Sequence, residues 1–111
     1  MAKAYLISVY RVIKDPARHA VYAKLALSAI EAGGGRILAR GMAVKAYEAG
    51  QLERTVIIEF DSVAQAAQMH GGLAYRAALE VLGDSAVRDT RIVYGVEPAS
   101  VDIIRNQIAT S

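Results

Sequence analysis

The chain has no cysteine, no tryptophan and a single phenylalanine among its 111 residues. The lack of cysteine excludes disulfides, thiol catalysis and cysteine-based metal binding. No apolar run approaches membrane-spanning length, and the first residues show neither the apolar region nor the cleavage site of a signal peptide. We therefore expect a soluble protein of the cytoplasm.

Neither sign of charge predominates, because 13 lysines and arginines face 11 acidic residues and the net charge is +2. No long basic run is present, which argues against nucleic acid as a partner. The first predicted helix has few basic residues, so no membrane surface is expected to bind it. The two histidines, His19 and His70, lack metal-ligand spacing, and no dinucleotide fingerprint occurs. We predict neither a metal nor a cofactor.

Apolar periodicity and capping residues predict six elements of secondary structure. Asp15-Pro16 opens a helix that Gly33 ends as a left-handed cap, and Ser62 caps a second helix, which Gly71-Gly72 interrupts. The predicted strands cover residues 4–13, 36–46, 54–60 and 91–96, and the helices cover 16–32 and 63–82.

The order β-α-β-β-α-β predicts an α+β ferredoxin-like fold with an antiparallel four-stranded sheet. We expect a single domain over residues 1–97. Residues 98–111 form a C-terminal tail that either docks on a partner subunit or frays.

The hydrophobic share of 54% is high for a domain that stands alone. Alternation along the strands is incomplete, and it leaves Leu6, Tyr10, Ile57 and Val93 on faces that a lone domain covers poorly. Burying each such side chain is worth about 1.5–3 kcal/mol. We therefore predict a homodimer whose subunits pair through their sheets. The alternatives are a cover formed by the tail or by a different partner.

Several motifs in order resemble one known family. They are Asp15-Pro16 with Tyr22, residues 34–41, residues 54–62 and Ala74-Tyr75-Arg76. The chain resembles, over residues 4–96, the domain-of-unknown-function family numbered thirteen-thirty, within the dimeric alpha-beta barrel superfamily. The resemblance implies a ferredoxin-like fold whose sheet pairs with that of a second subunit.

The same resemblance brings no assigned reaction. Relatives in the superfamily include cofactor-free monooxygenases, haem-handling proteins, and isomerases or dehydratases that act on small rings. Met42 and His70-Gly71-Gly72 depart from the family pattern, and the second departure affects the mouth of any pocket.

Two residues are candidates for catalysis. His70 precedes two glycines at a helix break, where a general acid or base is both positioned and accessible, although a solvated loop histidine is the alternative. Glu59 lies among apolar residues on a strand, where it either pairs with a cation such as Arg40 or has a raised pKa. An ion pair across the sheet or the dimer interface is the structural alternative for Glu59. His19 is interpreted as a surface residue of the first helix.

The ligand-binding candidates are Arg40, Tyr22 and Tyr75. The chain has six tyrosines, and a buried tyrosine combines an apolar ring with a hydroxyl that needs a partner. The first hypothesis is a cofactor-free enzyme of oxygenase or isomerase type, with a small acidic or phenolic ligand held between helices and sheet. The second is a dimer without catalysis that binds a small ligand or serves a structural or stress-associated role.

Overall fold

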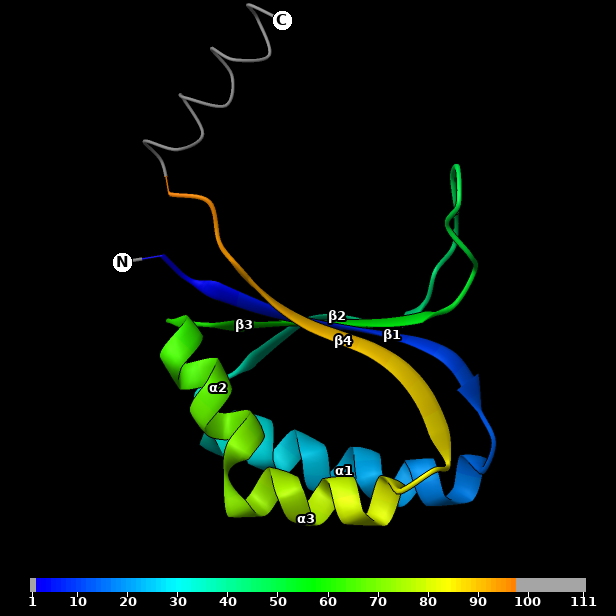
Figure 1. The fold of residues 1–111 in the computed structure, drawn as a ribbon, viewed down its shortest axis with the longest axis horizontal. Helices are drawn as coiled ribbons and strands as arrows, with labels where there is room; N and C mark the ends of the chain where they lie inside the picture. The colour runs from blue at the N-terminus through cyan, green and yellow to red at the C-terminus, as the bar shows by residue number, and fades with distance from the viewer. Residues whose placement is uncertain (1, 98–111) are drawn as a thin grey trace, which may run out of the picture.

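The computed structural model describes residues 2–97, which form one antiparallel sheet with helices on one side (Figure 1). The elements are β1 (Ala4–Ile13), α1 (Pro16–Ala32), β2 (Arg36–Met42), β3 (Arg54–Phe60), α2 (Val63–Gly71), α3 (Leu73–Leu82) and β4 (Ala86–Tyr94). The strand order is β2-β3-β1-β4, and every neighbouring pair is antiparallel. The predicted α+β ferredoxin-like fold is confirmed.

Local signals set the ends of the helices. Asp15 caps α1, because its carboxylate accepts the backbone N–H of Arg18 at 3.1 Å, and Ser62 caps α2 in the same way. The predicted second helix is divided at Gly72 into α2 and α3. The left-handed conformation after α1 belongs to Gly34, with φ +88°, and not to the predicted Gly33, whose φ is −83°. The turn therefore needs its glycine one residue later than the sequence indicated.

Two strands end where the sequence predicts and two do not. β1 and β3 have the predicted bounds, whereas β2 stops at Met42 instead of Ala46. β4 begins at Ala86, five residues before the predicted start at Arg91. Between β2 and β3, residues 43–53 form an arm that rises from the sheet on the side away from the helices (Figure 1).

The hydrophobic core lies between the helices and one face of the sheet. Phe60 and Leu6 are fully buried there, packed with Ile58 and with small residues of the helices such as Ala66 and Ala78. Leu6 and Tyr10 were expected on a poorly covered face, and this is wrong, because both are buried beneath the helices. The helices therefore cover the face of β1 that carries Leu6, Ser8 and Tyr10.

The opposite face of the sheet, here called the outer face, is covered by none of the helices α1, α2 and α3 (Figure 1). Register places Ile7 opposite Ile57 at its centre and Tyr5 opposite Val93 beside them. These side chains are partly exposed, and Val93 is 44% exposed. No helix within residues 2–97 is long and apolar enough to cross a membrane. The predicted tail at residues 98–111 lies outside the described residues.

Candidate functional site

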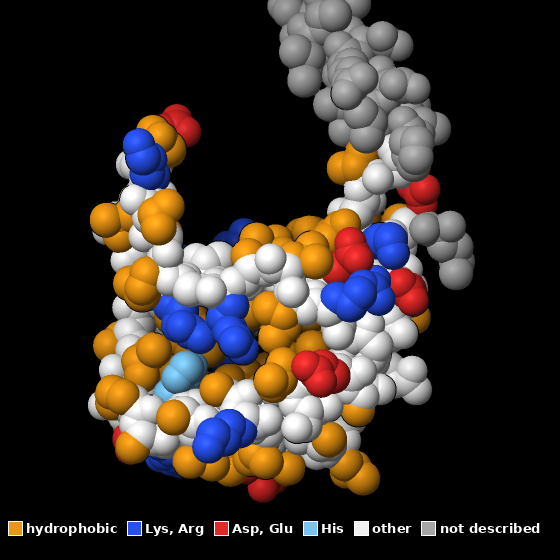
Figure 2. Space-filling model, turned by 180° about the vertical axis from the view of Figure 1, so that it is seen from behind, with side chains coloured by type: hydrophobic (Ala, Val, Ile, Leu, Met, Phe, Trp, Pro, Cys, Tyr) orange, Lys and Arg blue, Asp and Glu red, His pale blue; other side chains and the backbone are white. Residues whose placement is uncertain are grey.

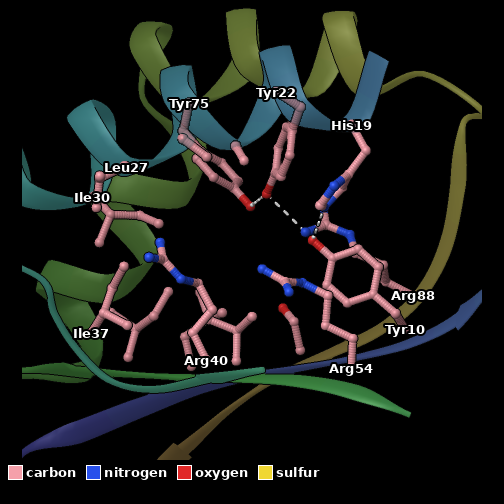
Figure 3. A pocket seen from close by; sticks show the side chains of 16 residues that line it. Tyr10, His19, Tyr22, Leu27, Ile30, Ile37, Arg40, Arg54, Tyr75 and Arg88 are labelled. Carbon is pink, nitrogen blue, oxygen red and sulfur yellow. Dashed lines mark hydrogen bonds between the residues drawn. The ribbon is translucent and has the colours of Figure 1, made fainter. Parts of the chain in front are cut away.

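A cavity of about 50 Å³ lies between α1 and the helix-covered face of the sheet (Figure 3). One part of its lining, here called the apolar floor, includes Leu6, Ile37 and Ile58, and the rest includes arginines, tyrosines and one histidine. In the space-filling view, basic side chains lie at one side of a hollow, next to a histidine (Figure 2). A water needs about 10–15 Å³ of such space, so the cavity has room for a few waters or for part of a small ligand.

Three arginines reach the cavity from three different strands. Arg40 lies on β2, Arg54 on β3 and Arg88 on β4, and the pleat turns all three toward the helices. Arg40 is opposite Val56 and Arg88 is opposite Tyr10, which both belong to the helix-covered face. The alternation that places apolar side chains in the core therefore also places the three guanidinium groups around one cavity.

These guanidinium groups have no acidic counterpart. No Asp or Glu lines the cavity, and none of the three arginines forms an ion pair within residues 2–97. The Nε of Arg54 is buried and has no hydrogen-bond partner in the same part of the chain. A buried donor of this kind costs about 1–3 kcal/mol when unpaired. The site is thus a concentrated positive charge with an unsatisfied donor.

Arg88 is held by two tyrosine rings. Its guanidinium lies 5.5 Å from the ring centre of Tyr10 and 5.0 Å from that of Tyr22, and its Nη1 donates to the Tyr22 hydroxyl at 2.8 Å. The Tyr22 and Tyr75 hydroxyls lie 2.7 Å apart and hydrogen-bond to each other. Burial raises the pKa of Tyr22, and the neighbouring Tyr75 adds to the effect. Tyr22 is therefore neutral at physiological pH.

His19 forms the other polar side of the cavity. It lies on α1 one turn before Tyr22, and its Nε2 is 3.0 Å from the Tyr10 hydroxyl. Burial lowers the pKa of His19, and the charges of Arg54 and Arg88 lower it further, so the imidazole is neutral at pH 7. His19 was interpreted as a surface residue of the first helix; it is partly buried and lines the cavity. The three-residue spacing from Tyr22, which places both on one helix face, was the signal that could have found it.

The structure brings together Arg40, Tyr22 and Tyr75, the three residues proposed from the sequence as ligand-binding candidates, around this one cavity. His70 lies outside the lining. Its ring is 5.1 Å from that of Tyr75, and burial lowers its pKa, with further effects from Arg88 and Arg76. His70 thus lies beside Tyr75 and does not line the cavity.

Glu59 lies on the outer face and is separated by the sheet from the cavity. Its carboxylate accepts from the Tyr5 hydroxyl at 2.9 Å and from Arg36 Nε at 3.0 Å, and Lys3 is 3.9 Å away. The hydrogen bonds from Tyr5 and Arg36 lower the pKa of Glu59. The predicted pairing of Glu59 with Arg40 is not formed, because their strands present them to opposite faces. Glu59 belongs to an ion-pair cluster across the sheet.

The sequence matches the model of one family, described as Domain of unknown function (DUF1330), over residues 3–96. The chain belongs to this family. A search of curated proteins found no match. Among the residues that the structure describes, no group of three or more histidines and acids is placed to hold a metal ion.

Solved structures share the fold at low sequence identity. A protein of unknown function from Rhodopseudomonas palustris has a TM-score of 0.66 and 18% identity, covering 87% of this chain and 85% of that chain. SnoaB, a cofactor-independent oxygenase from Streptomyces nogalater, has a TM-score of 0.63 and 6% identity, covering 87% and 96%. A dimeric ferredoxin-like protein of unknown function from Thermobifida fusca has a TM-score of 0.51 and 14% identity, covering 84% and 91%. These likenesses show the fold.

Proposed function

We propose that this protein binds a small organic anion in the helix–sheet cavity and catalyses proton transfer on it, as a cofactor-free enzyme of isomerase or oxygenase type. The observation that carries the proposal is the set of three arginines around one cavity to which residues 2–97 contribute no carboxylate. Cofactor-independent oxygenation is the activity named for SnoaB, which shares the fold. That likeness is compatible with the proposal but does not select a substrate.

The charges explain why the ligand is anionic. Guanidinium groups remain protonated at any physiological pH, so the three positive charges repel one another in the free protein. A carboxylate accepts two parallel N–H bonds from an arginine, and it would satisfy the buried Nε of Arg54. The small cavity with an apolar floor favours a ligand with one ring or a short chain.

The neutral His19 supports proton transfer over passive binding. A general base must be unprotonated and within reach of its proton, directly or through one hydroxyl, and Tyr10 supplies such a hydroxyl. In this proposal the role first expected of His70 and Glu59 passes to His19, because neither of the other two lines the cavity. A ligand-binding dimer without catalysis is the alternative.

We further propose that the protein is a homodimer formed through the outer face. Ile7 and Ile57 are central on that face, and the arm at residues 43–53 stands on the same side of the sheet. Val44 and Tyr47 on the arm are 90% and 74% exposed, so an apolar surface continues from the sheet onto the arm. The Thermobifida fusca protein is described as dimeric, which supports a dimer here.

Anion binding is tested by titrating the full chain with benzoate and with its neutral counterpart benzamide in a calorimeter. A hydrogen bond to a charged group is worth about 1.5–3 kcal/mol, so benzoate should bind about tenfold or more tightly than benzamide. Equal affinities, or no binding of either compound, would show that the arginines do not form an anion site.

Proton transfer is tested with phenylpyruvate, which has a carboxylate and an acidic C–H beside its carbonyl. Exchange of that hydrogen for deuterium, followed by NMR, should be faster with the protein than in buffer. His19→Gln should remove the acceleration, and His70→Gln serves as the matched histidine variant. Loss of exchange in His70→Gln with full exchange in His19→Gln would return the role to His70. No acceleration by the unmodified protein would favour the non-catalytic alternative.

A further inference from the structure

The Tyr22–Tyr75 pair has one hydroxyl proton to spare. The two hydroxyls carry two protons, but only one can lie between oxygens that are 2.7 Å apart. Arg88 donates to Tyr22 and so takes no proton from the pair. Within residues 2–97 no other acceptor contacts either hydroxyl. The pair therefore presents one O–H donor to the cavity that both residues line.

Arg88 strengthens this donor. Its positive charge at 2.8 Å polarises the Tyr22 hydroxyl, and hydrogen bonds in a chain strengthen one another in a site shielded from water. The tyrosines are 4% and 3% exposed, so the donor is preorganised and largely dehydrated. Such a group binds an oxygen that carries negative charge far better than a neutral oxygen.

A proton acceptor lies close to this donor. The ring centres of His19 and Tyr22 are 5.8 Å apart, and those of His19 and Tyr10 are 5.1 Å apart. The Tyr10 hydroxyl joins the cavity to Nε2 of His19. A proton acceptor and an O–H donor thus line the same small cavity, and Arg54 and Arg88 line it as well (Figure 3).

Building on the proposed function, we infer that the substrates are phenols, which the site binds as phenolates. The phenol O–H bond breaks and its proton goes to the Tyr10 hydroxyl, whose own proton moves to Nε2 of His19. The electron pair stays on the phenolic oxygen, which accepts the spare O–H of the Tyr22–Tyr75 pair and an N–H of Arg88. The apolar floor, which includes Leu6 and Ile58, holds the ring.

The test uses 4-nitrophenol, whose phenolate absorbs visible light while the phenol does not. Titrating the protein-bound probe with pH should give an apparent pKa lower than in buffer by about one unit or more, which is a tenfold or greater preference for the phenolate. An unshifted pKa of the bound probe, or no binding of the probe, would overturn the inference.

Tyrosine-to-phenylalanine variants test where the preference arises. Tyr22→Phe and Tyr75→Phe each leave one hydroxyl with a free proton, so each single variant should keep part of the shift. The double variant has neither hydroxyl. It should lose most of the pKa shift of the probe, apart from the share that Arg88 supplies. Tyr94→Phe, on a tyrosine that is 73% exposed and outside the cavity lining, is the matched control. A double variant that keeps the whole shift would overturn the inference.

The outcomes separate the inference from the proposed function. If benzoate binds and 4-nitrophenol binds without a shift, the anion site stands and the phenolate inference fails. If neither compound binds, both fail. The titration of the unmodified protein tests the inference by itself, so the inference can be refuted even when a variant does not fold. Circular dichroism of each variant shows whether it has kept the native fold.

Discussion

Replacing Arg54 with methionine should weaken anion binding without weakening the fold. Methionine keeps a long unbranched side chain but removes the charge and every donor. In the free protein the change removes a buried Nε that has no partner, which is worth about 1–3 kcal/mol. It also removes a guanidinium 5.9 Å from the ring centre of Tyr10, a contact worth about 0.5–1 kcal/mol. The net expectation is a free energy of unfolding that is unchanged or higher by up to about 2.5 kcal/mol.

The same change should cost benzoate a charge-assisted hydrogen bond. A loss of about 1.5–3 kcal/mol corresponds to a decrease in affinity of roughly 10- to 150-fold. Calorimetric titration measures the affinity, and urea unfolding of the ligand-free protein measures the stability. Arg54→Lys keeps the positive charge but lacks the planar guanidinium group. Its affinity for benzoate should therefore lie between those of the unmodified chain and Arg54→Met.

Arg76→Met is the matched control, since Arg76 is exposed on α3 and lies outside the cavity lining. It should change neither quantity by more than a few tenths of a kcal/mol. The reasoning would be refuted if Arg54→Met bound benzoate as tightly as the unmodified chain while unfolding more easily. That result would make Arg54 a structural residue.

Three further predictions concern the dimer, the response to acid and the turn after α1. Ile57→Arg places charges at the centre of the outer face, so it should convert dimer to monomer in analytical ultracentrifugation, whereas an unmodified chain that sediments as a monomer would disprove the interface. Burial lowers the pKa of His19 in the folded chain, so below about pH 6.5 the unfolded chain binds more protons and stability falls as pH falls; urea unfolding at several pH values should show a smaller decrease for His19→Gln. Gly35→Ala would place a Cβ 2.6 Å from Ile30 and 2.8 Å from Phe60, so it should destabilise the chain by about 1–3 kcal/mol in the same assay, and an unchanged midpoint would contradict this packing.

The elements that could be predicted are those that strong local signals mark. β1 and β3 are rich in apolar and β-branched residues, and capping residues mark the starts of α1 and α2, so these bounds agree with the structure. The start of β4 was missed because Arg88 and Thr90 interrupt the apolar pattern on its helix-covered face. Arg88 is also a residue of the cavity. A polar residue that lines the cavity thus also interrupts the hydrophobic periodicity that would have predicted the start of β4.

The residues of the candidate site were likewise predicted only in part. Arg40, Tyr22 and Tyr75 were found because an arginine on a strand and tyrosines on helices are unusual enough to be noticed. His19 and Arg88 were missed, because a single polar residue on a helix or strand is ordinarily a solvated one. Glu59 was noticed for a good reason, but its face was unknown and its partners proved to be Tyr5, Arg36 and Lys3.

The sequence by itself determined the order of the elements, the α+β class and the excess of apolar residues over what a lone domain needs. Alternation along a strand defines two faces, but it does not say which face the helices will cover, because that depends on how the crossovers pack. Only the tertiary structure decided that Leu6, Arg40 and Arg88 lie beneath the helices and Glu59 does not. The cavity exists because three strands, distant in sequence, turn their arginines toward the same helix.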